Sequence, residues 1–278
     1  MNTIISQLIV TIQGEGPTVG TPILLIRLGN CNLNCNFCDS KWSNNLKSSS
    51  EFNPSNISFP TTITDDNFSE FVNFINSKYL NKYQINTILL TGGEPFLDKE
   101  FIGKIVNSID IKVSAFEIET NGTLLNATTD HKLFKYCWDK IIRINISPKL
   151  DPKAYINNDR IKEFRDIVEL FISNEAVSLN TILKETPTSI IYKFVHCKEY
   201  ERNIESFISG YKSANSIYIM PLTPARSKFK TEESFYKKFR ENCSETLDFC
   251  MKTGYIFSPR EHIWLFNQNQ RNEYVDLG

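Results

Sequence analysis

Six short apolar runs, rich in β-branched residues and bounded by turn residues, constrain the fold more than any other feature of this chain. They occupy residues 23–28, 85–90, 115–119, 141–146, 190–195 and 217–220. A continuous apolar run, without polar alternation, is typical of a strand that is buried on both faces of a parallel sheet. We therefore predict six such strands.

Helical patterns separate the runs. Apolar residues recur at helical spacing within residues 65–79, 98–109, 160–171, 199–211 and 232–251. In the first of these segments, Phe68, Phe71, Val72 and Ile75 share one face, and Thr64 is a candidate N-cap. Strands that alternate with helices predict βα units and a parallel sheet. With 278 residues, the chain has the length of a single α/β barrel domain.

Residues 44–60 interrupt this alternation. The segment is rich in Ser and Asn, contains Pro54 and Pro60, and has few large apolar residues. We expect a mobile surface insertion in a loop. The alternative is a lid, because long loops beside active sites often close over them.

The overall composition argues against several kinds of partner and location. A formal net charge of −1 gives no electrostatic reason to expect nucleic acid or an anionic membrane as a partner. No apolar run has the length of a bilayer-spanning helix. The apolar stretch at residues 4–12 lacks the basic leader and the cleavage site of a signal peptide. We expect a cytoplasmic protein that binds neither nucleic acid nor membrane.

Three of the seven cysteines are crowded together. Cys31, Cys35 and Cys38 have the spacing C-x3-C-x2-C and directly follow the first predicted strand. Three such thiolates can ligate three irons of a cubane iron–sulfur cluster and leave the fourth iron without a protein ligand. The alternative is a structural zinc ion. Zinc requires four ligands, however, and the next candidates, His131 and Cys137, are about a hundred residues away.

The remaining cysteines have no such spacing. An odd total does not suit the disulfide framework of a small secreted protein. We interpret these four as buried or half-buried free thiols in a reducing compartment: Cys137, Cys197, Cys243 and Cys250.

Polar motifs follow the predicted strands. Thr-Gly-Gly-Glu-Pro at 91–95 follows the second strand, Glu-Thr-Asn-Gly at 119–122 the third, Ser-Pro-Lys at 147–149 the fourth, and Met-Pro at 220–221 the sixth. The C-terminal ends of barrel strands meet at one mouth, so we expect these groups to converge. Two glycines allow the backbone to approach a ligand closely, and a carboxylate such as Glu94 can bind an ammonium group. Taken singly, each motif is also compatible with a turn or a helix cap.

The cysteine spacing, with an aromatic residue before its last cysteine, resembles the radical S-adenosylmethionine (SAM) superfamily. Residues 91–95 resemble the glycine-rich segment that receives the methionyl amino group in that superfamily. The resemblance implies a [4Fe–4S] cluster on Cys31, Cys35 and Cys38 whose open iron is chelated by SAM. Electron transfer from the cluster would cleave SAM to a 5′-deoxyadenosyl radical.

A longer pattern narrows the resemblance to one family. The segment Ile-Gln-Gly-Glu-Gly-Pro at 12–17, Arg27, residues 29–33, Asp-Ser at 39–40 and Ser-Pro-Arg-Glu-His at 258–262 are similar to the 7-carboxy-7-deazaguanine synthases. The similarity covers nearly the whole chain, apart from residues 44–60 and a weaker stretch around 151–187. It implies a partial TIM-type βα barrel of about six strands, a single domain over residues 1–278, and a homodimer.

The resemblance also implies a reaction. The substrate 6-carboxy-5,6,7,8-tetrahydropterin would be converted to 7-carboxy-7-deazaguanine by radical ring contraction with loss of ammonia. SAM would start each turnover by hydrogen abstraction and would be regenerated at its end. Mg2+ would be required, and a flavodoxin-like or ferredoxin-like protein would supply the electron.

Residue by residue, the resemblance assigns three sets of contacts. The substrate contacts are Ile12, Gln13, Gly14, Glu15, Arg27 and Thr91. The SAM contacts are Phe37, Asp39, Gly93, Glu94, Glu119, Asn121, Ser147 and Lys149. Ser40 is the Mg2+ ligand. A guanidinium suits the substrate carboxylate because it binds bidentately. The alternatives are a buried salt bridge for Arg27 and a solvated turn for Glu15.

Ser40 departs from the family, which usually has threonine at this position. Serine keeps the hydroxyl oxygen but loses the methyl group that restricts its rotamers, which puts the Mg2+ affinity in doubt. Arg260 and His262 match a tail motif in part of the family, with either a structural or a substrate-closing role. One rival reading is another radical SAM enzyme, such as a glycyl-radical activating enzyme, which should not need residues 12–17. The other is a non-catalytic zinc-binding module.

Overall fold

The six predicted strands form the centre of one curved sheet. The computed structural model describes residues 1–46, 49–109, 115–126, 139–155, 158–173, 188–210 and 216–266. Six parallel neighbours follow one another in the order β2, β5, β6, β7, β8, β9. Their bounds are Pro22–Leu28, Thr87–Gly92, Ala115–Thr120, Ile141–Ile146, Ser189–His196 and Ile217–Pro221. Each strand overlaps a predicted run, so the predicted parallel sheet is confirmed.

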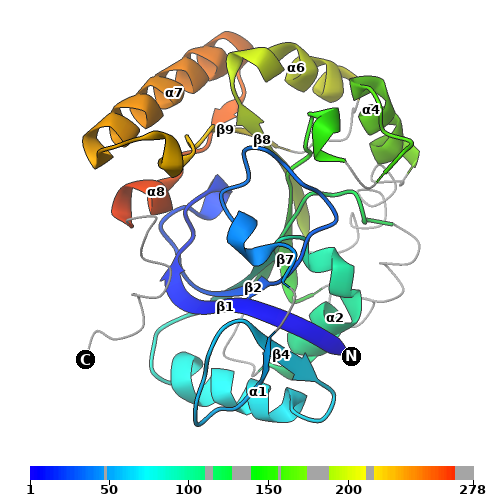
Figure 1. Ribbon diagram of the computed structural model, residues 1–278, viewed down its shortest axis with the longest axis vertical. Coiled ribbons are helices and arrows are strands. Elements are labelled where there is room, and N and C mark those ends of the chain that lie inside the picture. Colours follow the sequence, from blue (N-terminus) through cyan, green and yellow to red (C-terminus); the bar gives the residue numbers. More distant parts are fainter. Residues whose placement is uncertain are drawn as a thin grey trace.

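Helices cover the outer face of this sheet, and the fold is a partial βα barrel (Figure 1). Four of them follow a parallel strand in the chain: α2 (Lys99–Ser108), α4 (Phe164–Ser173), α6 (Glu201–Gly210) and α7 (Glu232–Thr253). Helix α4 begins later than the predicted residue 160. The Asp166 carboxylate accepts the backbone N–H groups of Lys162 and Glu163, both at 2.8 Å, and so closes a turn just before the helix. None of the described helices combines the length and the apolar character needed to cross a lipid bilayer.

Helix α1 (Phe68–Ile75) continues into a π-helical turn over Asn76–Leu80. The prediction that Thr64 caps this helix is wrong. Thr64 is the last residue of β4 (Thr61–Thr64) and pairs with Asn2, so the sheet holds it in an extended conformation. Its backbone N–H donates to the side chain of Asn67 at 2.9 Å, and Asn67 is the residue from which the helix starts.

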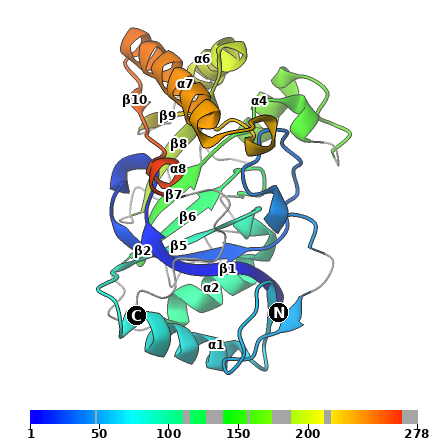
Figure 2. The same cartoon turned by 60° about the vertical axis from the view of Figure 1, so that its left-hand side comes forward.

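Four strands outside the predicted set extend the sheet at its two edges. β1 (Asn2–Ile12) is antiparallel to β2, β4 is antiparallel to β1, and β3 (Ser50–Glu51) is parallel to β4. At the other edge, β10 (Ile256–Phe257) is parallel to β9. Figure 2 shows α7 and β10 at one end of the molecule and α1 at the opposite end. The sheet therefore mixes a parallel centre with antiparallel pairing at β1 and β4.

The described part of residues 44–60 is anchored to the body of the protein. Phe52 is buried, and its ring lies 5.2 Å from that of Phe71 and 5.8 Å from that of Phe74, measured between centroids. β3 adds backbone pairing to β4. The segment thus packs along the edge of the sheet and against α1, which differs from the expected free surface loop.

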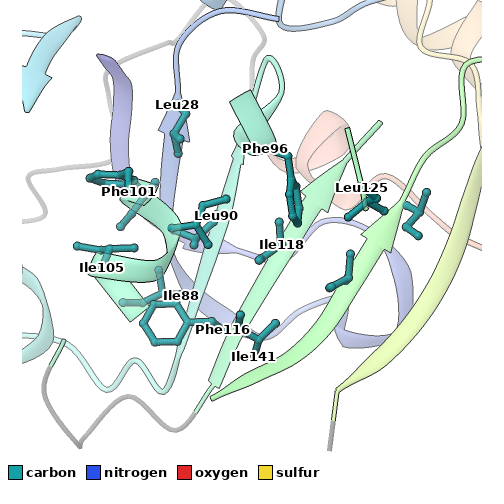
Figure 3. Close-up of a cluster of buried hydrophobic side chains, with 14 of the residues drawn as sticks. Leu28, Ile88, Leu90, Phe96, Phe101, Ile105, Phe116, Ile118, Leu125 and Ile141 are labelled. Atoms are coloured by element: carbon teal, nitrogen blue, oxygen red, sulfur yellow. The ribbon is translucent and has the colours of Figure 1, made fainter. Parts of the chain in front are cut away.

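Buried apolar side chains fill the space between α2 and the strands (Figure 3). Phe101 and Ile105 from α2 pack toward Ile88 and Leu90 of β5 and Phe116 of β6. Burying one such side chain stabilises the fold by about 1.5–3 kcal/mol. This layer fixes the strands whose C-terminal ends carry the polar motifs.

The isolated cysteines follow the prediction where the structure describes them. Cys197 and Cys243 are half-buried free thiols, and Cys250 is a buried one. Cys137 and His131 lie outside the described residues.

Candidate active site

A cavity of about 750 Å³ opens inside the barrel, toward the C-terminal ends of the parallel strands. The structure brings all the predicted site residues except Glu94 to its lining, whereas their individual roles stay predictions. The predicted residues that line it are Ile12, Gln13, Gly14, Glu15, Arg27, Cys31, Cys35, Phe37, Cys38, Asp39, Ser40, Thr91, Gly93, Glu119, Asn121, Ser147 and Lys149. Of the described residues of the 44–60 segment, only Asn44 lines the cavity. The alternative that this segment is a lid therefore gains little support.

The cysteine loop is held by Asn30, directly after β2. Asn30 has a left-handed backbone with φ of 69°, which asparagine tolerates better than most residues. Its N–H donates to the Ser43 carbonyl at 2.8 Å, and its side-chain oxygen accepts from the backbone N–H of Leu46 at 2.8 Å. Its carbonyl accepts from the backbone N–H of Glu94 at 2.9 Å. The loop is thereby fixed to the glycine-rich segment after β5.

Amide groups lie beside two of the three thiols. The side-chain nitrogen of Asn121 lies 3.9 Å from the Cys31 sulfur, and that of Asn44 lies 3.9 Å from the Cys38 sulfur. The backbone N–H of Leu33 points at the Cys31 sulfur at 3.4 Å. Burial raises the pKa of Cys31 to about 11 and also raises the pKa of Cys35. Without a metal the thiols of Cys31 and Cys35 therefore keep their protons, and these donors become useful once the sulfurs are metal-bound and negative.

The thiols do not converge on one point. In the described part of the chain, no group of three or more Cys, His, Asp or Glu side chains is arranged to hold a single metal ion. A tetrahedral zinc site needs such convergence. A cubane cluster does not, because each cysteine binds a different iron. The spacing of the three cysteines on one loop is compatible with a cluster.

The two glycines after β5 are required by close packing. A Cβ on Gly92 would lie 2.3 Å from the Leu28 carbonyl oxygen, and a Cβ on Gly93 would lie 2.0 Å from that of Asn30. Only glycine permits such an approach. The segment is therefore part of the frame of the cysteine loop as well as part of the cavity lining.

Glu94 does not face the cavity, contrary to its predicted contact with SAM. The residue is fully buried, and burial raises its pKa. Its carboxylate accepts hydrogen bonds from the N–H of Phe96 at 3.0 Å, the hydroxyl of Thr120 at 2.6 Å and the N–H of Asn121 at 2.7 Å. Because Glu94 is fully buried and these three donors hold its carboxylate, it fastens the end of β6 to the loop after β5 and is not part of the cavity lining.

The opposite side of the cavity is built from charged side chains. Glu15 accepts from Lys193 at 2.9 Å through one oxygen and from Arg260 at 2.9 Å through the other. Lys193 also donates to Glu119 at 2.7 Å, and Arg260 also pairs with Asp39. Lys193 was missed by the sequence analysis. The available signal was a lysine inside an apolar strand, which needs a buried partner as Arg27 does.

The chain segment after β10 closes this side. The backbone N–H of Glu261 donates to the Gly14 carbonyl at 3.0 Å, and the Ser258 hydroxyl accepts from the N–H of Gly16 at 2.8 Å. The His262 ring lies so close to Gly14 that a Cβ on this glycine would be 2.2 Å from its Nδ1. Burial, and then the nearby Arg260, lower the pKa of His262 to about 4, so the imidazole is neutral near pH 7.

The side chain of Gln13 forms hydrogen bonds within the protein. Its side chain is only 3% exposed, and its carbonyl oxygen accepts from the N–H of Glu15 at 3.2 Å. Its amide nitrogen lies 3.5 Å from the carboxylate of Glu117, which also pairs with Arg143 at 2.5 Å. The side chain of Gln13 therefore orients residues 13–15.

Arg27 differs from the other two buried cations of the cavity. Its Nε donates to Gln7 at 3.1 Å, and its guanidinium lies 5.8 Å from the ring centroid of Trp42. Within the described residues it forms no ion pair, so the buried salt bridge considered as an alternative is absent there. Its remaining N–H donors are available to an anionic ligand in the cavity.

Comparison with known proteins places the chain in a family. A family model described as the radical SAM superfamily matches residues 25–180, more than half of the chain. A 7-carboxy-7-deazaguanine synthase from Aquifex aeolicus is 31% identical over 63% of this chain and 67% of its own length. The chain belongs to the radical SAM 7-carboxy-7-deazaguanine synthase family.

Further relatives of that family differ in coverage. The synthase from Rickettsia prowazekii is 34% identical, and the match spans 58% of this chain and 64% of that protein, just under two thirds of its length. The synthase from Hyperthermus butylicus is 24% identical over 95% of this chain and 93% of its own. A crystal structure of QueE from Escherichia coli has a TM-score of 0.53, with 16% identity and 93% coverage of both chains. At that identity the structural match supports the fold alone.

Membership of the radical SAM superfamily implies a [4Fe–4S] cluster and SAM, and the residues present fit both. Three thiols on one loop face the cavity with amide donors beside two of them. On the same side, Gly93, Ser147 and Lys149 line the cavity, and Lys149 donates to the Ser147 hydroxyl at 2.8 Å. The cavity also has the volume that a cofactor and a small substrate require together.

Proposed function

We propose that this chain converts 6-carboxy-5,6,7,8-tetrahydropterin to 7-carboxy-7-deazaguanine with release of ammonia. The reaction balances without an external oxidant, because the substrate loses one nitrogen and three hydrogens as ammonia and the ring contracts. Family membership supports the reaction type, and the contents of the cavity support the substrate.

The single observation that carries the proposal is the guanidinium of Arg27. It lines the cavity at the end of β2, four residues before the first cluster cysteine. Since it has no ion pair among the described residues, a ligand carboxylate can take its free N–H groups. The carboxylate at position 6 of the pterin is such a group.

Glu15 supports the recognition of another part of the same substrate. Its carboxylate is ionised, because Lys193 and Arg260 hold its pKa well below the usual range despite its burial. An ionised carboxylate only accepts hydrogen bonds. The 2-amino group and the ring N–H of a pterin are the donors that match it.

When bound, the cluster and SAM would supply a carbon-centred radical that abstracts a hydrogen atom from the substrate. Cys31, Cys35 and Cys38 would hold the cluster, and Asn121 and Asn44 would donate to two of its sulfur ligands. Gly93, Glu119, Ser147 and Lys149 line the part of the cavity beside them. Glu94 would act indirectly by fixing the loops after β5 and β6.

Ser40 fits a weakly held Mg2+ ion. Its hydroxyl lies 3.7 Å from the Cys38 sulfur and lines the cavity. The neighbouring Asp39 carboxylate is engaged by Arg260. Mg2+ usually takes few protein ligands and completes its shell with water and substrate oxygens, so one hydroxyl together with the substrate carboxylate is sufficient.

The test is anaerobic reconstitution of the full chain with iron and sulfide, followed by SAM, Mg2+, a reductant and 6-carboxytetrahydropterin. We expect mass spectrometry to show 7-carboxy-7-deazaguanine without stoichiometric loss of SAM. Arg27→Met should raise the KM for the substrate about a hundredfold. Arg27→Lys should recover part of the affinity, because lysine keeps the charge but cannot donate two parallel hydrogen bonds to one carboxylate.

Two results would overturn the proposal at different levels. A brown protein that cleaves SAM and leaves the pterin unchanged would contradict the proposed substrate but not the radical SAM chemistry. A colourless protein that carries zinc would contradict both the substrate and the radical SAM chemistry. The homodimer, the small redox protein as electron donor and the single domain over residues 1–278 belong to the same proposal, and the continuous ten-stranded sheet supports the last of these.

A further inference from the structure

Five side chains of alternating charge form a continuous chain along one side of the cavity. Arg260 joins Asp39 to Glu15, and Lys193 joins Glu15 to Glu119. All five line the cavity. They come from the cysteine loop, the segment after β1, β6, β8 and the start of α8 (Glu261–Leu265), so the fold brings them together from distant parts of the sequence.

Glu15 is the centre of this chain. Its side chain is 11% exposed, and each of its two oxygens is held by a different cation: Oε1 by Arg260 and Oε2 by Lys193. Two contacts on two oxygens fix the plane of the carboxylate as well as its position. Each oxygen keeps a further lone pair for a ligand.

Lys193 is the more deeply buried cation, with 2% of its side chain exposed. It rises from the middle of β8, where its neighbours Tyr192 and Phe194 are buried apolar residues. A lysine in that position is costly unless it is paired, and here it is paired twice. Neither Lys193 nor Arg260 is left with an uncompensated charge, whereas Arg27 has no ion pair among the described residues.

The cavity lining therefore offers two kinds of group. Arg27 has N–H donors for an anion, and Glu15 has oriented acceptors. We propose that Lys193 is a specificity-determining positioning residue that holds Glu15, together with Arg260, as the acceptor for a paired N–H donor edge on the substrate ring. This inference rests on the proposed function and names the group that makes the site selective for 2-amino rings.

The test compares two carboxylated rings that differ at one atom. 6-Carboxypterin carries a 2-amino group, and 6-carboxylumazine carries an oxygen at the same place, so only the first presents the donor pair. Dissociation constants are measured by calorimetry on the anaerobically cluster-loaded full chain. We expect the wild-type protein to prefer 6-carboxypterin by roughly tenfold to a hundredfold, because the second ring leaves a buried carboxylate facing an acceptor.

Lys193→Met should reduce this preference to within about threefold, since Glu15 is then held from one side only. Lys193→Arg should restore most of it by keeping a cation between Glu15 and Glu119. Lys104→Met is the control: it also removes a doubly paired lysine, with Asp65 and Glu100 as its partners, and none of the three residues lines the cavity. It should leave the ratio of the two constants unchanged.

The outcomes separate this inference from the proposed function. A wild-type protein that binds neither ring contradicts the proposed function. A wild-type protein that binds both equally, or a Lys193→Met variant that loses affinity for both by the same factor, overturns the role of Lys193. If Lys193→Met does not fold, as judged by circular dichroism, Glu15→Gln replaces it, and an unchanged ratio in that variant overturns the inference as well.

Discussion

The two walls of the cavity are built on different physical principles. The cluster wall, made by residues 28–44, 91–94 and 120–121, is held by close backbone contact and by amide hydrogen bonds. The tail wall, made by Glu15, Lys193 and residues 258–262, is held by ion pairs between side chains. We expect the cluster wall to be sensitive to added side-chain volume and the tail wall to be sensitive to the loss of a charge. The following experiments challenge this contrast from the largest expected effect to the smallest.

Removing a charge from the tail wall should have the largest effect on stability. Arg260→Met leaves Glu15 with a single cation and Asp39 without its ion-pair partner, and we expect the free energy of unfolding to fall by about 3 kcal/mol. Iron content per chain should change less than stability, because Arg260 contacts the cluster wall through the side chain of Asp39 and not through a thiol. Urea denaturation and iron analysis measure both.

Lys238→Met is the control, since it breaks an exposed ion pair with Glu241 and should cost less than about 1 kcal/mol. An Arg260→Met variant as stable as wild type would show that the tail wall does not depend on its charges.

Adding volume to the cluster wall should act on the metal. The methyl group of Gly93→Ala would collide with the Asn30 carbonyl, so we expect a loss of about 1–3 kcal/mol and a marked fall in iron after reconstitution. Gly20→Ala is the control for a loss of stability without a steric collision, because its φ of 87° strains an alanine but no atom lies within 4 Å of the added Cβ. It should keep its iron. Equal iron in the two variants would contradict the steric account.

Acidification should loosen the tail wall through His262. Its pKa is about 4 in the folded protein against 6.5 for an unperturbed histidine, so the unfolded chain binds more protons between these values. The contribution of His262 to the free energy of unfolding is fully present above pH 6.5 and is lost as the pH falls toward 4. A third of the side chain is exposed, so we expect only about 1 kcal/mol.

The check is thermal melting of wild type and His262→Gln from pH 7 to 4.5. The variant should show a shallower loss of melting temperature. Its residual slope should come from His196, whose pKa burial also lowers. Identical slopes would show that His262 does not titrate in this window.

The smallest effect concerns the metal ligand. Ser40→Thr adds a methyl group that restricts the hydroxyl rotamer, and we expect the Mg2+ concentration for half-maximal activity to fall by about threefold. A Ser40→Ala variant should raise it. An unchanged Mg2+ response in both variants would remove Ser40 from the metal site.

The contrast between the walls also explains what the sequence could predict. The parallel strands and the cysteine loop follow from continuous patterns, because buried strands and clustered ligands leave local signals. The cavity lining on the cluster side was predicted from the polar motifs after the strands together with the resemblance to the radical SAM superfamily. Glu94 was misplaced because its motif gives the residue type but not the direction of the carboxylate, which Thr120 and Asn121 decide.

The remaining features depend on contacts between distant residues. Residues 4–12 of β1 were rejected as a signal peptide but were not predicted as a strand, because their pairing with β2 depends on contacts that local periodicity does not reveal. Thr64 looked like a helix cap until its pairing with Asn2 was known. Lys193 carried a local signal, an ionisable residue in an apolar strand, but its partners Glu15 and Glu119 could be found only in the folded protein.

The backbone contacts between residues 14–16 and 258–261 also set an order of assembly. Gly16 and Ser258 are 242 positions apart, so at ordinary translation rates the second emerges roughly ten to fifty seconds after the first. Until that segment is present, Glu15 lacks Arg260, and the contacts at Gly14 and Gly16 are not made. We expect iron–sulfur delivery to be fastest on this nascent or open form and to slow once the last segment docks. The cluster would thus be inserted before the last segment of the chain closes the cavity.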